Sequence, residues 1–289
     1  MSRLPGRLVL SLAVAAVLAG CVTSQYYADP PKEAPPPTGP VLRVGVTPTY
    51  PPIIFKQADQ IVGVESELAA LLGARLGRTA QLFEMPFTEQ IDALLAGRTD
   101  IVMSGMSVTD ARKLRVAFTE PYLEAGLMAA VRTADVRLYP SRDAVLATIA
   151  TVGVIEGTTG DVFVQRNFPN ARRVAFTRAS DGALGLRRRT VDMFVHDAPS
   201  IAWLVSANEA ELGAIRQYLN REPLAWALRP SDTELLRQIN AALAGWKQDG
   251  TLAGVLGRWL PYLTRADRAP GVHLGRRALV APLGPGGSG

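Results

Sequence analysis

The sequence predicts an α/β protein with two lobes, each a mainly parallel sheet flanked by helices. Short apolar strand candidates alternate with amphipathic helices, which is typical of βαβ units. This alternation starts twice, near residue 41 and again near residue 142. Two helical stretches close the pattern, and we expect them to return to the first lobe. A length of 289 residues permits two lobes of roughly 100–150 residues each.

The first set of elements begins with Val41 to Val46, a short apolar strand that prolines end. Apolar residues at helical spacing then predict an amphipathic helix over 64–76. The chain continues with a strand at 81–84, a helix capped by Thr88 that buries residues in 91–95 and a strand at 100–103. A short helix after Thr109 and a further apolar run at 126–131 complete this set.

The second set has strands at 152–155, 173–176 and 192–196, among helices near 142–148, 161–167, 181–189 and 198–206. The closing helices span 232–247 and 251–260. We therefore assign residues 41–130 plus 224–264 to lobe 1 and residues 131–223 to lobe 2, joined by two connecting segments. Residues 265–289 lack apolar periodicity and are rich in glycine and proline near their end, so we expect a disordered tail.

The first 40 residues indicate export and a tether. Arg3 and Arg7 precede an apolar run of about 12 residues, too short to span a bilayer, so we interpret 1–20 as a signal peptide rather than a buried helix. Leu18-Ala19-Gly20-Cys21 resembles the lipobox of bacterial lipoproteins, which implies lipidation of Cys21 and a membrane anchor in the cell envelope. A chance cysteine near an ordinary cleavage site is the alternative. Clustered prolines predict an extended tether over 21–40.

Composition argues against metal and nucleic-acid chemistry. The formal net charge is +5, and +3 without the two arginines of the leader, which is weak for a polyanion-binding protein. One cysteine and two histidines give no recognisable zinc spacing. The run Arg187-Arg188-Arg189 predicts a solvated helix end. We expect no metal, no cofactor and no nucleic-acid partner, and we expect a monomer.

Four polar clusters each follow a predicted strand at its carboxyl end, which is where open parallel sheets bind ligands. The clusters are Tyr50, Ser104 to Arg112, Gly157 to Gly160, and His196-Asp197. Because the carboxyl ends of parallel strands meet at one edge of a sheet, we expect these clusters to line a common cleft.

The chemistry of these clusters suits a zwitterion. Arg112 stands one turn into a helix capped by Thr109 and offers a planar fork for a carboxylate. Asp197 supplies the opposite charge, which an ammonium group needs. Tyr50 and Phe87 offer flat apolar walls for the rest of a small ligand.

The resemblance to a known family rests on short stretches that are weak singly and specific in their order and spacing. They are Leu42-Arg43-Val44-Gly45-Val46, Tyr50-Pro51-Pro52, Gly63 to Ala69, Thr109-Asp110-Ala111-Arg112, Phe118-Thr119-Glu120-Pro121-Tyr122, Val152 to Thr159, Asp249-Gly250-Thr251-Leu252 and Trp259-Leu260. Over about 41–263 the chain resembles the extracellular solute-binding proteins of family 3, the receptors of polar amino-acid ABC transporters. This resemblance implies a type II periplasmic-binding-protein-like fold and an ABC permease in the cytoplasmic membrane as partner.

The resemblance also implies roles for individual residues. Arg112 would bind the α-carboxylate of the ligand with help from Ser107 and Thr159, and Asp197 would bind its α-amino group. Tyr50 and Phe87 would flank its side chain, and we expect further contacts from Thr47, Ser104, Gly105 and Thr158. Two departures weaken the match: Thr47 stands where many amino-acid binders carry an acidic residue, and Gly105 replaces a serine found in some relatives.

Most of these residues also have a purely structural interpretation. Arg112 could pair on the surface with Asp110 or Glu120, Asp197 and Thr158 could be helix N-caps, and Tyr50 and Phe87 could be core residues. We interpret His196 as a strand-end residue beside the cleft rather than as a catalytic base.

Two other functions stay open. The stretches 100–107 and 118–123 also resemble periplasmic cyclohexadienyl dehydratases, whose elimination needs a positioned general acid. In those relatives a second acidic residue follows three positions after the aspartate matched by Asp197, and this chain has Ser200 there. We therefore predict no catalytic residue. A transport-independent sensory or envelope module is the remaining alternative, which a neighbouring permease gene would argue against.

Overall fold

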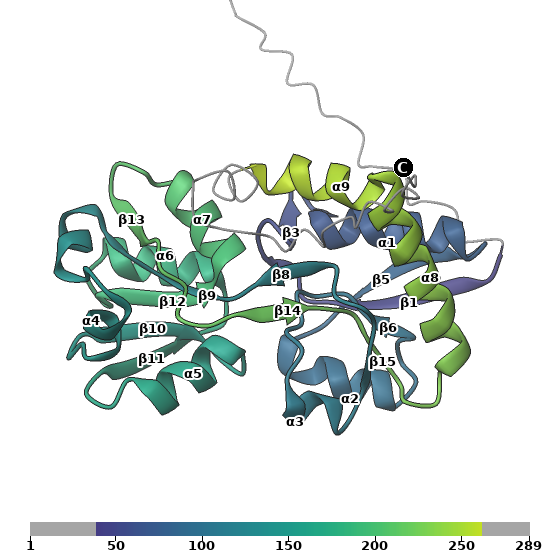
Figure 1. Ribbon diagram of the computed structural model, residues 1–289, viewed down its shortest axis with the longest axis horizontal. Coiled ribbons are helices and arrows are strands. Elements are labelled where there is room, and N and C mark those ends of the chain that lie inside the picture. The colour runs from purple at the N-terminus through teal and green to yellow at the C-terminus, as the bar shows by residue number, and fades with distance from the viewer. Residues whose placement is uncertain (1–38, 262–289) are drawn as a thin grey trace, which may run out of the picture. The chain divides into compact units, whose positions relative to one another are not determined.

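The computed structural model describes residues 39–261, and they form two α/β lobes joined by two connecting strands (Figure 1). The predicted signal peptide, Cys21, most of the predicted tether and the predicted tail lie outside the described residues. In Figure 1 the second lobe lies on the left and the first lobe on the right, with the connecting strands between them.

The first lobe is built on a sheet with strand order β5-β1-β6-β15-β7. Its strands are β1 (Val41–Val46), β5 (Thr79–Glu84), β6 (Ile101–Val102), β7 (Ala117–Phe118) and β15 (Ala227–Leu228). β1 pairs in parallel with β5 and β6, from Val41↔Thr79 onward. β15 runs antiparallel to both of its neighbours, so the sheet is mixed with one reversed strand.

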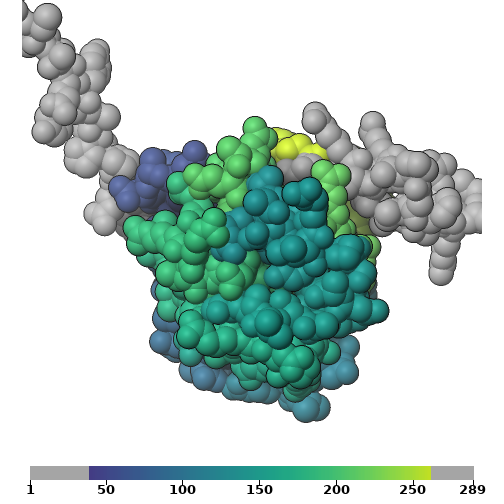
Figure 2. All heavy atoms as spheres, turned by 90° about the vertical axis from the view of Figure 1, so that its left-hand side faces the viewer, coloured from purple at the N-terminus to yellow at the C-terminus, as the bar shows by residue number. Residues whose placement is uncertain are grey.

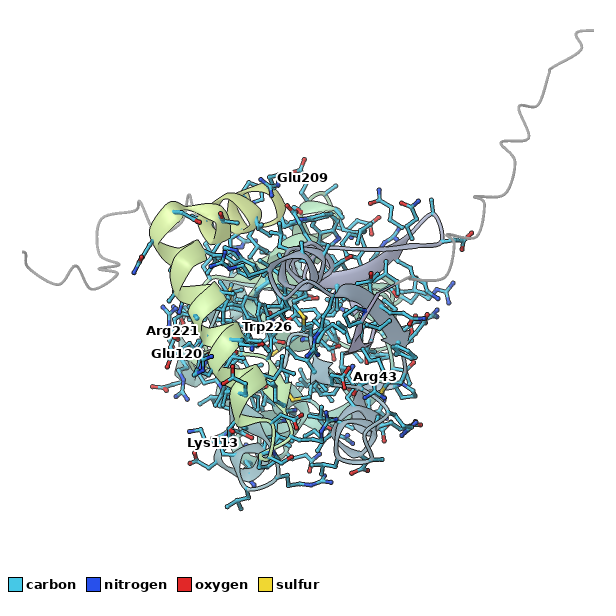
Figure 3. All side chains as sticks on the ribbon, turned by 90° about the vertical axis from the view of Figure 1, so that its right-hand side faces the viewer. Arg43, Lys113, Glu120, Glu209, Arg221 and Trp226 are labelled. Carbon is cyan, nitrogen blue, oxygen red and sulfur yellow. The ribbon has the colours of Figure 1, made fainter. Side chains whose placement is uncertain are left out.

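Helices cover both faces of this first sheet. They are α1 (Val64–Arg75), the short 3-10 helix η1 (Phe87–Glu89), α2 (Gln90–Leu95), α3 (Asp110–Lys113), α8 (Thr233–Asp249) and α9 (Thr251–Trp259). Leu68 of α1 and Leu243 of α8 pack with strand residues such as Val44 in the main core, while Leu94 of α2 packs on the other face. The two C-terminal helices thus return to the first lobe, as expected from the sequence (Figure 3).

The second lobe has a sheet with strand order β11-β10-β12-β9-β13. Its strands are β9 (Leu127–Arg132), β10 (Thr151–Ile155), β11 (Arg172–Phe176), β12 (Met193–Asp197) and β13 (Leu212–Ile215). β9 is the reversed strand here, since it pairs antiparallel with β12 and β13. Residues 127–130, which the sequence interpretation gave to lobe 1, belong to this sheet by their strand pairing.

Helices also cover both faces of the second sheet. Figure 2 views the molecule from the side of this second lobe. They are the 3-10 helix η2 (Thr133–Leu138), α4 (Arg142–Leu146), α5 (Thr159–Asn167), α6 (Ala179–Arg187) and α7 (Ala198–Ser206). Side chains alternate across β12: Val195 packs with α5, and Phe194 packs with α6 and α7. Each lobe therefore has its own core.

Two short strands connect the lobes: β8 (Leu123–Ala125) and β14 (Glu222–Leu224) pair antiparallel with each other. β8 continues into β9, and β14 continues into β15, so each connecting strand enters its lobe as the reversed strand of the sheet. We call the β8–β14 pair the hinge. It is tied to the first lobe by Val108 N–H, which donates to Pro223 O at 2.9 Å, and by Ala225 N–H, which donates to Met106 O at 3.1 Å.

A small third sheet was not expected from the sequence. It consists of β2 (Thr49–Tyr50), β3 (Ile54–Gln57) and β4 (Gln60–Val62), in that order. The expected cap at Thr88 is wrong, because Thr88 lies inside η1 and α2 begins at Gln90 without a capping side chain. The expected cap at Thr109 is confirmed: its Oγ1 accepts from Arg112 N–H at 3.2 Å.

Candidate ligand-binding site

A cavity of about 490 Å³ lies between the two lobes. Its walls come from the chain that follows β1, β5 and β6 in the first lobe and β10, β11 and β12 in the second. It is lined by every predicted ligand-binding residue: Thr47, Tyr50, Phe87, Ser104, Gly105, Ser107, Arg112, Thr158, Thr159 and Asp197. Residues expected near the carboxyl ends of parallel strands therefore lie around one cavity, and their roles in binding stay predictions.

Arg112 reaches the cavity from the first turn of α3. Its guanidinium donates to Ser107 O at 2.9 Å and lies 5.3 Å from the centre of the Phe87 ring. Asp110 pairs with Lys113 instead, and no carboxylate within residues 39–261 lies within 4.0 Å of the guanidinium. Burial lowers the pKa of Arg112, while the charges of Asp197 and Glu222 oppose that shift. The guanidinium is therefore mostly buried and still has donors for a carboxylate.

Asp197 faces the same cavity from the end of β12, and it is 5% exposed. It occupies the N-cap position of α7, but its side chain makes no capping hydrogen bond. Its Oδ1 atom is buried and has no hydrogen-bond partner among the described residues. A buried carboxylate oxygen without a partner is costly, so this atom is suited to receive an N–H donor from a ligand.

Tyr50 forms an aromatic wall with His196. The two rings are stacked, with centroids 4.9 Å apart, although they belong to different lobes. Asp197 N–H donates to His196 Nδ1 at 2.7 Å, which leaves the imidazole proton on Nε2 if the ring is neutral. Burial raises the pKa of Tyr50 well above its usual range, and the nearby carboxylate of Asp197 adds to that shift.

Gly105 provides the seat for the Tyr50 ring. Its φ is +64°, a left-handed backbone conformation that favours glycine. A Cβ atom here would lie 2.6 Å from Tyr50 Cδ1 and would overlap Cε1 as well. Glycine at this position, where some relatives have a serine, is therefore required by both the backbone and the packing in this chain.

The two threonines at the start of α5 have different environments. Thr158 caps the helix: its Oγ1 accepts from Asp161 N–H at 3.3 Å and donates to Ile155 O at 2.7 Å. Among the described residues the hydroxyl of Thr159 takes no part in capping α5, and it lies 3.4 Å from the Ser107 hydroxyl, across the gap between the lobes. Thr159 is therefore the freer of the two to meet a ligand.

Thr47 and Ser104 are joined by Gln90 in a buried polar network. The Gln90 amide donates to Thr47 Oγ1 at 2.5 Å and to Ser104 Oγ at 2.9 Å, while Ser104 Oγ also accepts from Thr47 N–H. The Thr47 hydroxyl in turn donates to Met85 O at 2.8 Å. These two residues line the cavity with side chains that the protein already uses to fix the loops behind it.

The sequence interpretation missed several lining residues. Glu84 ends β5, Glu156 and Arg178 follow β10 and β11, and all three line the cavity. Glu84 pairs with Lys56 at 2.6 Å, and Arg178 pairs with Asp181 at 3.1 Å. Their position at strand ends was the signal that could have found them, and the same holds for His196, which was placed beside the cleft without a ligand role.

Residues 39–261 lack two further kinds of feature. No helix there is long and apolar enough to cross a membrane. No group of at least three His, Cys, Asp or Glu side chains in this part of the chain could hold a metal ion.

Comparison with known proteins gives a consistent result. The chain is 26% identical to the L-cystine-binding protein TcyJ of Escherichia coli (strain K12) over 219 residues, which cover 75% of this chain and 82% of the relative. It is also similar to the crystal structure of an ancestral amino acid-binding protein, AncCDT-1, a precursor of cyclohexadienyl dehydratase, with 31% identity, a TM-score of 0.71, and coverage of 76% of this chain and 95% of that one. An ancestral arginine-binding protein bound to arginine gives 30% identity, a TM-score of 0.71, and coverage of 77% and 99%.

The match to a family model is the most direct of these findings. The model of the bacterial extracellular solute-binding proteins, family 3, matches residues 42–262, which is most of the chain. The chain therefore belongs to the bacterial extracellular solute-binding proteins of family 3.

Proposed function

We propose that this protein captures a small α-amino acid between its two lobes and delivers it to an ABC permease of the cytoplasmic membrane. One observation carries the proposal. Within residues 39–261, the Arg112 guanidinium has no carboxylate partner and the buried Asp197 Oδ1 has no donor, and the two line the same cavity from different lobes. An α-amino acid brings the two charged groups that complete this pair.

The residue roles follow from that placement. Arg112 binds the α-carboxylate with help from Ser107 and Thr159, and Asp197 binds the ammonium group. Tyr50 and Phe87 flank the ligand side chain. The remaining predicted residues shape the cavity wall: Thr47, Ser104, Gly105 and Thr158.

Ligand binding favours the closed form of the protein for a physical reason. The carboxylate and the ammonium of the ligand contact different lobes, so these contacts exist together only when the lobes close around the hinge. A ligand can shift such an equilibrium only by binding the two states differently. The proposed lobes are residues 41–126 with 224–264 and residues 127–223.

We also propose that the protein acts at the cell envelope as a monomer. Residues 1–20 serve as a lipoprotein signal peptide, Cys21 carries the lipid, and residues 21–40 hold the lobes away from the membrane. Mass spectrometry of the mature chain tests this directly. A lipid-modified cysteine at the new N-terminus is the expected result, and a mature chain that still begins at Met1 would contradict it.

A thermal-shift panel on the full chain tests the binding function. The panel contains the common amino acids, small dicarboxylates and prephenate. At 100 times its dissociation constant a ligand stabilises the folded state by about 2.7 kcal/mol, which is easily measured. We expect at least one α-amino acid to respond and Arg112→Ala to abolish the response. Arg115→Ala is the matched control, because Arg115 is an exposed arginine nearby that pairs with Asp92. A response only to compounds without an amino group would contradict the role of Asp197.

Catalysis on the same fold is the second candidate, because one similar structure is described as a precursor of cyclohexadienyl dehydratase. We propose binding rather than catalysis. The position three residues after Asp197 holds Ser200, which is fully buried and does not line the cavity, so it cannot supply a general acid there. Turnover of prephenate by the purified protein would reverse this ranking.

A further inference from the structure

A carboxyl group lies buried directly behind the binding site. Glu65 stands in the first turn of α1 and is 0% exposed, although glutamate at this place in a helix is ordinarily solvated. It does not line the cavity. Glu67, two residues later in the same helix, is partly exposed and pairs with Arg258. The burial of Glu65 therefore needs an explanation of its own.

One oxygen of this carboxyl group holds the binding loop. Glu65 Oε2 accepts from Gly105 N–H at 2.6 Å. Gly105 is the left-handed residue against which the Tyr50 ring packs, and Ser107 follows it two positions later. The hydrogen bond therefore fixes the Gly105 peptide. Two cavity-lining residues depend on that peptide: Ser107 follows it in the chain, and the Tyr50 ring packs against it.

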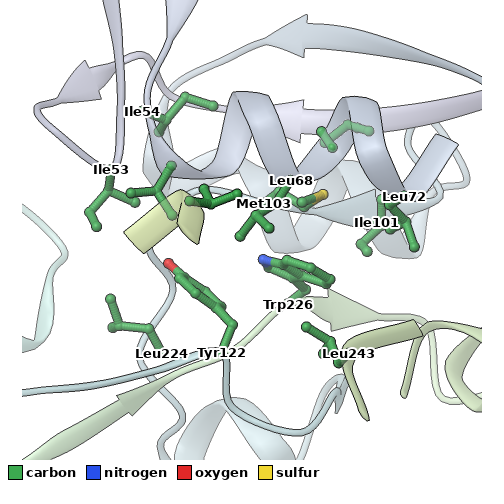
Figure 4. Close-up of a cluster of buried hydrophobic side chains, with 14 of the residues drawn as sticks. Ile53, Ile54, Leu68, Leu72, Ile101, Met103, Tyr122, Leu224, Trp226 and Leu243 are labelled. Atoms are coloured by element: carbon green, nitrogen blue, oxygen red, sulfur yellow. The ribbon is translucent and has the colours of Figure 1, made fainter. Parts of the chain in front are cut away.

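The other oxygen holds the chain beside the hinge. Glu65 Oε1 accepts from Trp226 Nε1–H at 3.2 Å. Trp226 follows β14 by two residues and stacks on Tyr122, which immediately precedes β8, with ring centroids 5.6 Å apart. Figure 4 shows the Trp226 nitrogen and the Tyr122 hydroxyl directed toward the same side of the cluster. Tyr122 and Trp226, which lie next to the first-lobe ends of the two hinge strands, are therefore both beside Glu65.

We infer that Glu65 is a positioning residue for ligand binding, which ties the Gly105 peptide of the binding loop to the Trp226 end of the hinge. This inference rests on the proposed function, because it assumes that the cavity binds a ligand. Fixing the loop before the ligand arrives reduces the entropy lost on binding, so the contribution of Glu65 is to affinity. If Glu65 had only a structural role, its substitution would destabilise the whole first lobe and would not loosen the binding loop more than other parts of that lobe.

The charge state of Glu65 provides a readout. Burial raises its pKa to about 8, while the Tyr122 hydroxyl beside it and the N–H donors of Gly105 and Trp226 act in the opposite direction. The buried hydroxyls of Tyr122 and Tyr50 face it, and Asp197 is the next charge beyond them. Since Glu65 accepts from the Trp226 indole, its titration must change the environment of that N–H group.

The first experiment needs no ligand. In the full, ¹⁵N-labelled chain we expect the Trp226 indole signal, assigned with Trp226→Phe, to shift with a midpoint near pH 8. Glu65→Gln should remove this midpoint and speed hydrogen exchange of the Gly105 amide about tenfold, with the second-lobe amides of β10 and β12 unchanged. Glu67→Gln is the matched control, because Glu67 lies on the same helix and accepts from the indole of Trp259 at 3.0 Å.

Two outcomes would overturn the inference. One is a Gly105 amide that exchanges in the wild type as fast as a solvent-exposed amide, which applies even if Glu65→Gln fails to fold. The other is exchange that quickens equally in both lobes, which indicates general destabilisation.

The second experiment measures affinity with L-arginine as the probe, chosen because a similar structure binds arginine. At a temperature where both proteins are folded, we expect Glu65→Gln to weaken binding about tenfold and Glu67→Gln to leave it unchanged. Equal affinity of Glu65→Gln and wild type would overturn the positioning role. If the wild type binds neither L-arginine nor any other amino acid, the proposed function fails, while the ligand-free readouts still decide on Glu65.

Discussion

The hydroxyl oxygens of Ser107 and Thr159 lie 3.4 Å apart, although one belongs to the first lobe and the other to the second. The stack of Tyr50 on His196 bridges the same gap. Phe55 of β3 also meets Trp203 of α7, with ring centroids 5.6 Å apart. The described structure therefore has its lobes in contact around the cavity, and a molecule in that cavity would touch both of them.

The neighbouring threonines 158 and 159 should respond differently to the same substitution. Thr159→Val removes a hydroxyl that faces the other lobe, so we expect ligand affinity to fall about threefold to tenfold with little loss of stability. Thr158→Val removes the cap of α5, so we expect the free energy of unfolding to fall by about 1 kcal/mol. Urea denaturation and calorimetric titration with the responding amino acid measure the two effects. The same pattern in both variants would contradict the distinction.

Asp197→Asn should impair binding without unfolding the protein. The carboxylate makes no capping bond to α7, so we expect the melting temperature of the ligand-free variant to stay close to that of the wild type. Loss of the charge that meets the ammonium should weaken binding of an α-amino acid by about 2–5 kcal/mol.

The measurement for this prediction compares two compounds by calorimetric titration. They are the amino acid that responds in the panel and its analogue without the amino group. We expect the variant to lose affinity for the first and to bind the second as weakly as the wild type does. Asp143→Asn is the control, since Asp143 is exposed in the first turn of α4. Undiminished binding of the amino acid would show that another group holds the ammonium.

The placement of the site could be predicted from the sequence because it depends on local pattern. Helical spacing identified α1 and α8, and short apolar runs identified β1, β10 and β12. The residues that end or follow the predicted strands, such as Asp197 in β12 and Arg112 after β6, are then brought together by the geometry of parallel sheets. None of these steps requires knowledge of a contact between distant segments.

The missed features depend on such distant contacts. β7 and β15 contain two residues each, and only their neighbours in the sheet define them as strands. Glu65 has the sequence context of a solvated helix start, where acidic residues are common. Its burial arises because Gly105 and Trp226 arrive from positions 40 and 161 residues away. No periodicity in the sequence carries that information.

Gly105→Ala should damage both stability and binding. The alanine backbone would have to adopt a φ of +64°, and its methyl group would overlap the Tyr50 ring, which lines the cavity. Gly97→Ala is a matched control: Gly97 has a φ of +72°, and a Cβ there meets no atom within 4 Å. We expect about 1 kcal/mol of destabilisation for the control and at least about 2 kcal/mol for Gly105→Ala, with loss of ligand response only in the latter. Urea denaturation and thermal shift measure the difference, and equal effects would contradict the steric account.

Stability should fall as the pH rises from about 4.5 to about 8, because of Glu65. Its pKa is 4.5 in the unfolded reference and about 8 in the folded protein, so within this range the folded state holds a proton that the unfolded state has lost. The stabilisation is complete below pH 4.5, decreases by up to about 1.4 kcal/mol per pH unit, and is fully lost above pH 8.

Glu65→Gln removes this titration, whereas Glu67→Gln retains it. We expect urea unfolding of the full chain at pH 5, 6, 7 and 8 to show a steeper decline for the wild type and Glu67→Gln than for Glu65→Gln. Parallel pH profiles for all three proteins would mean that Glu65 is ionised in the folded state at neutral pH.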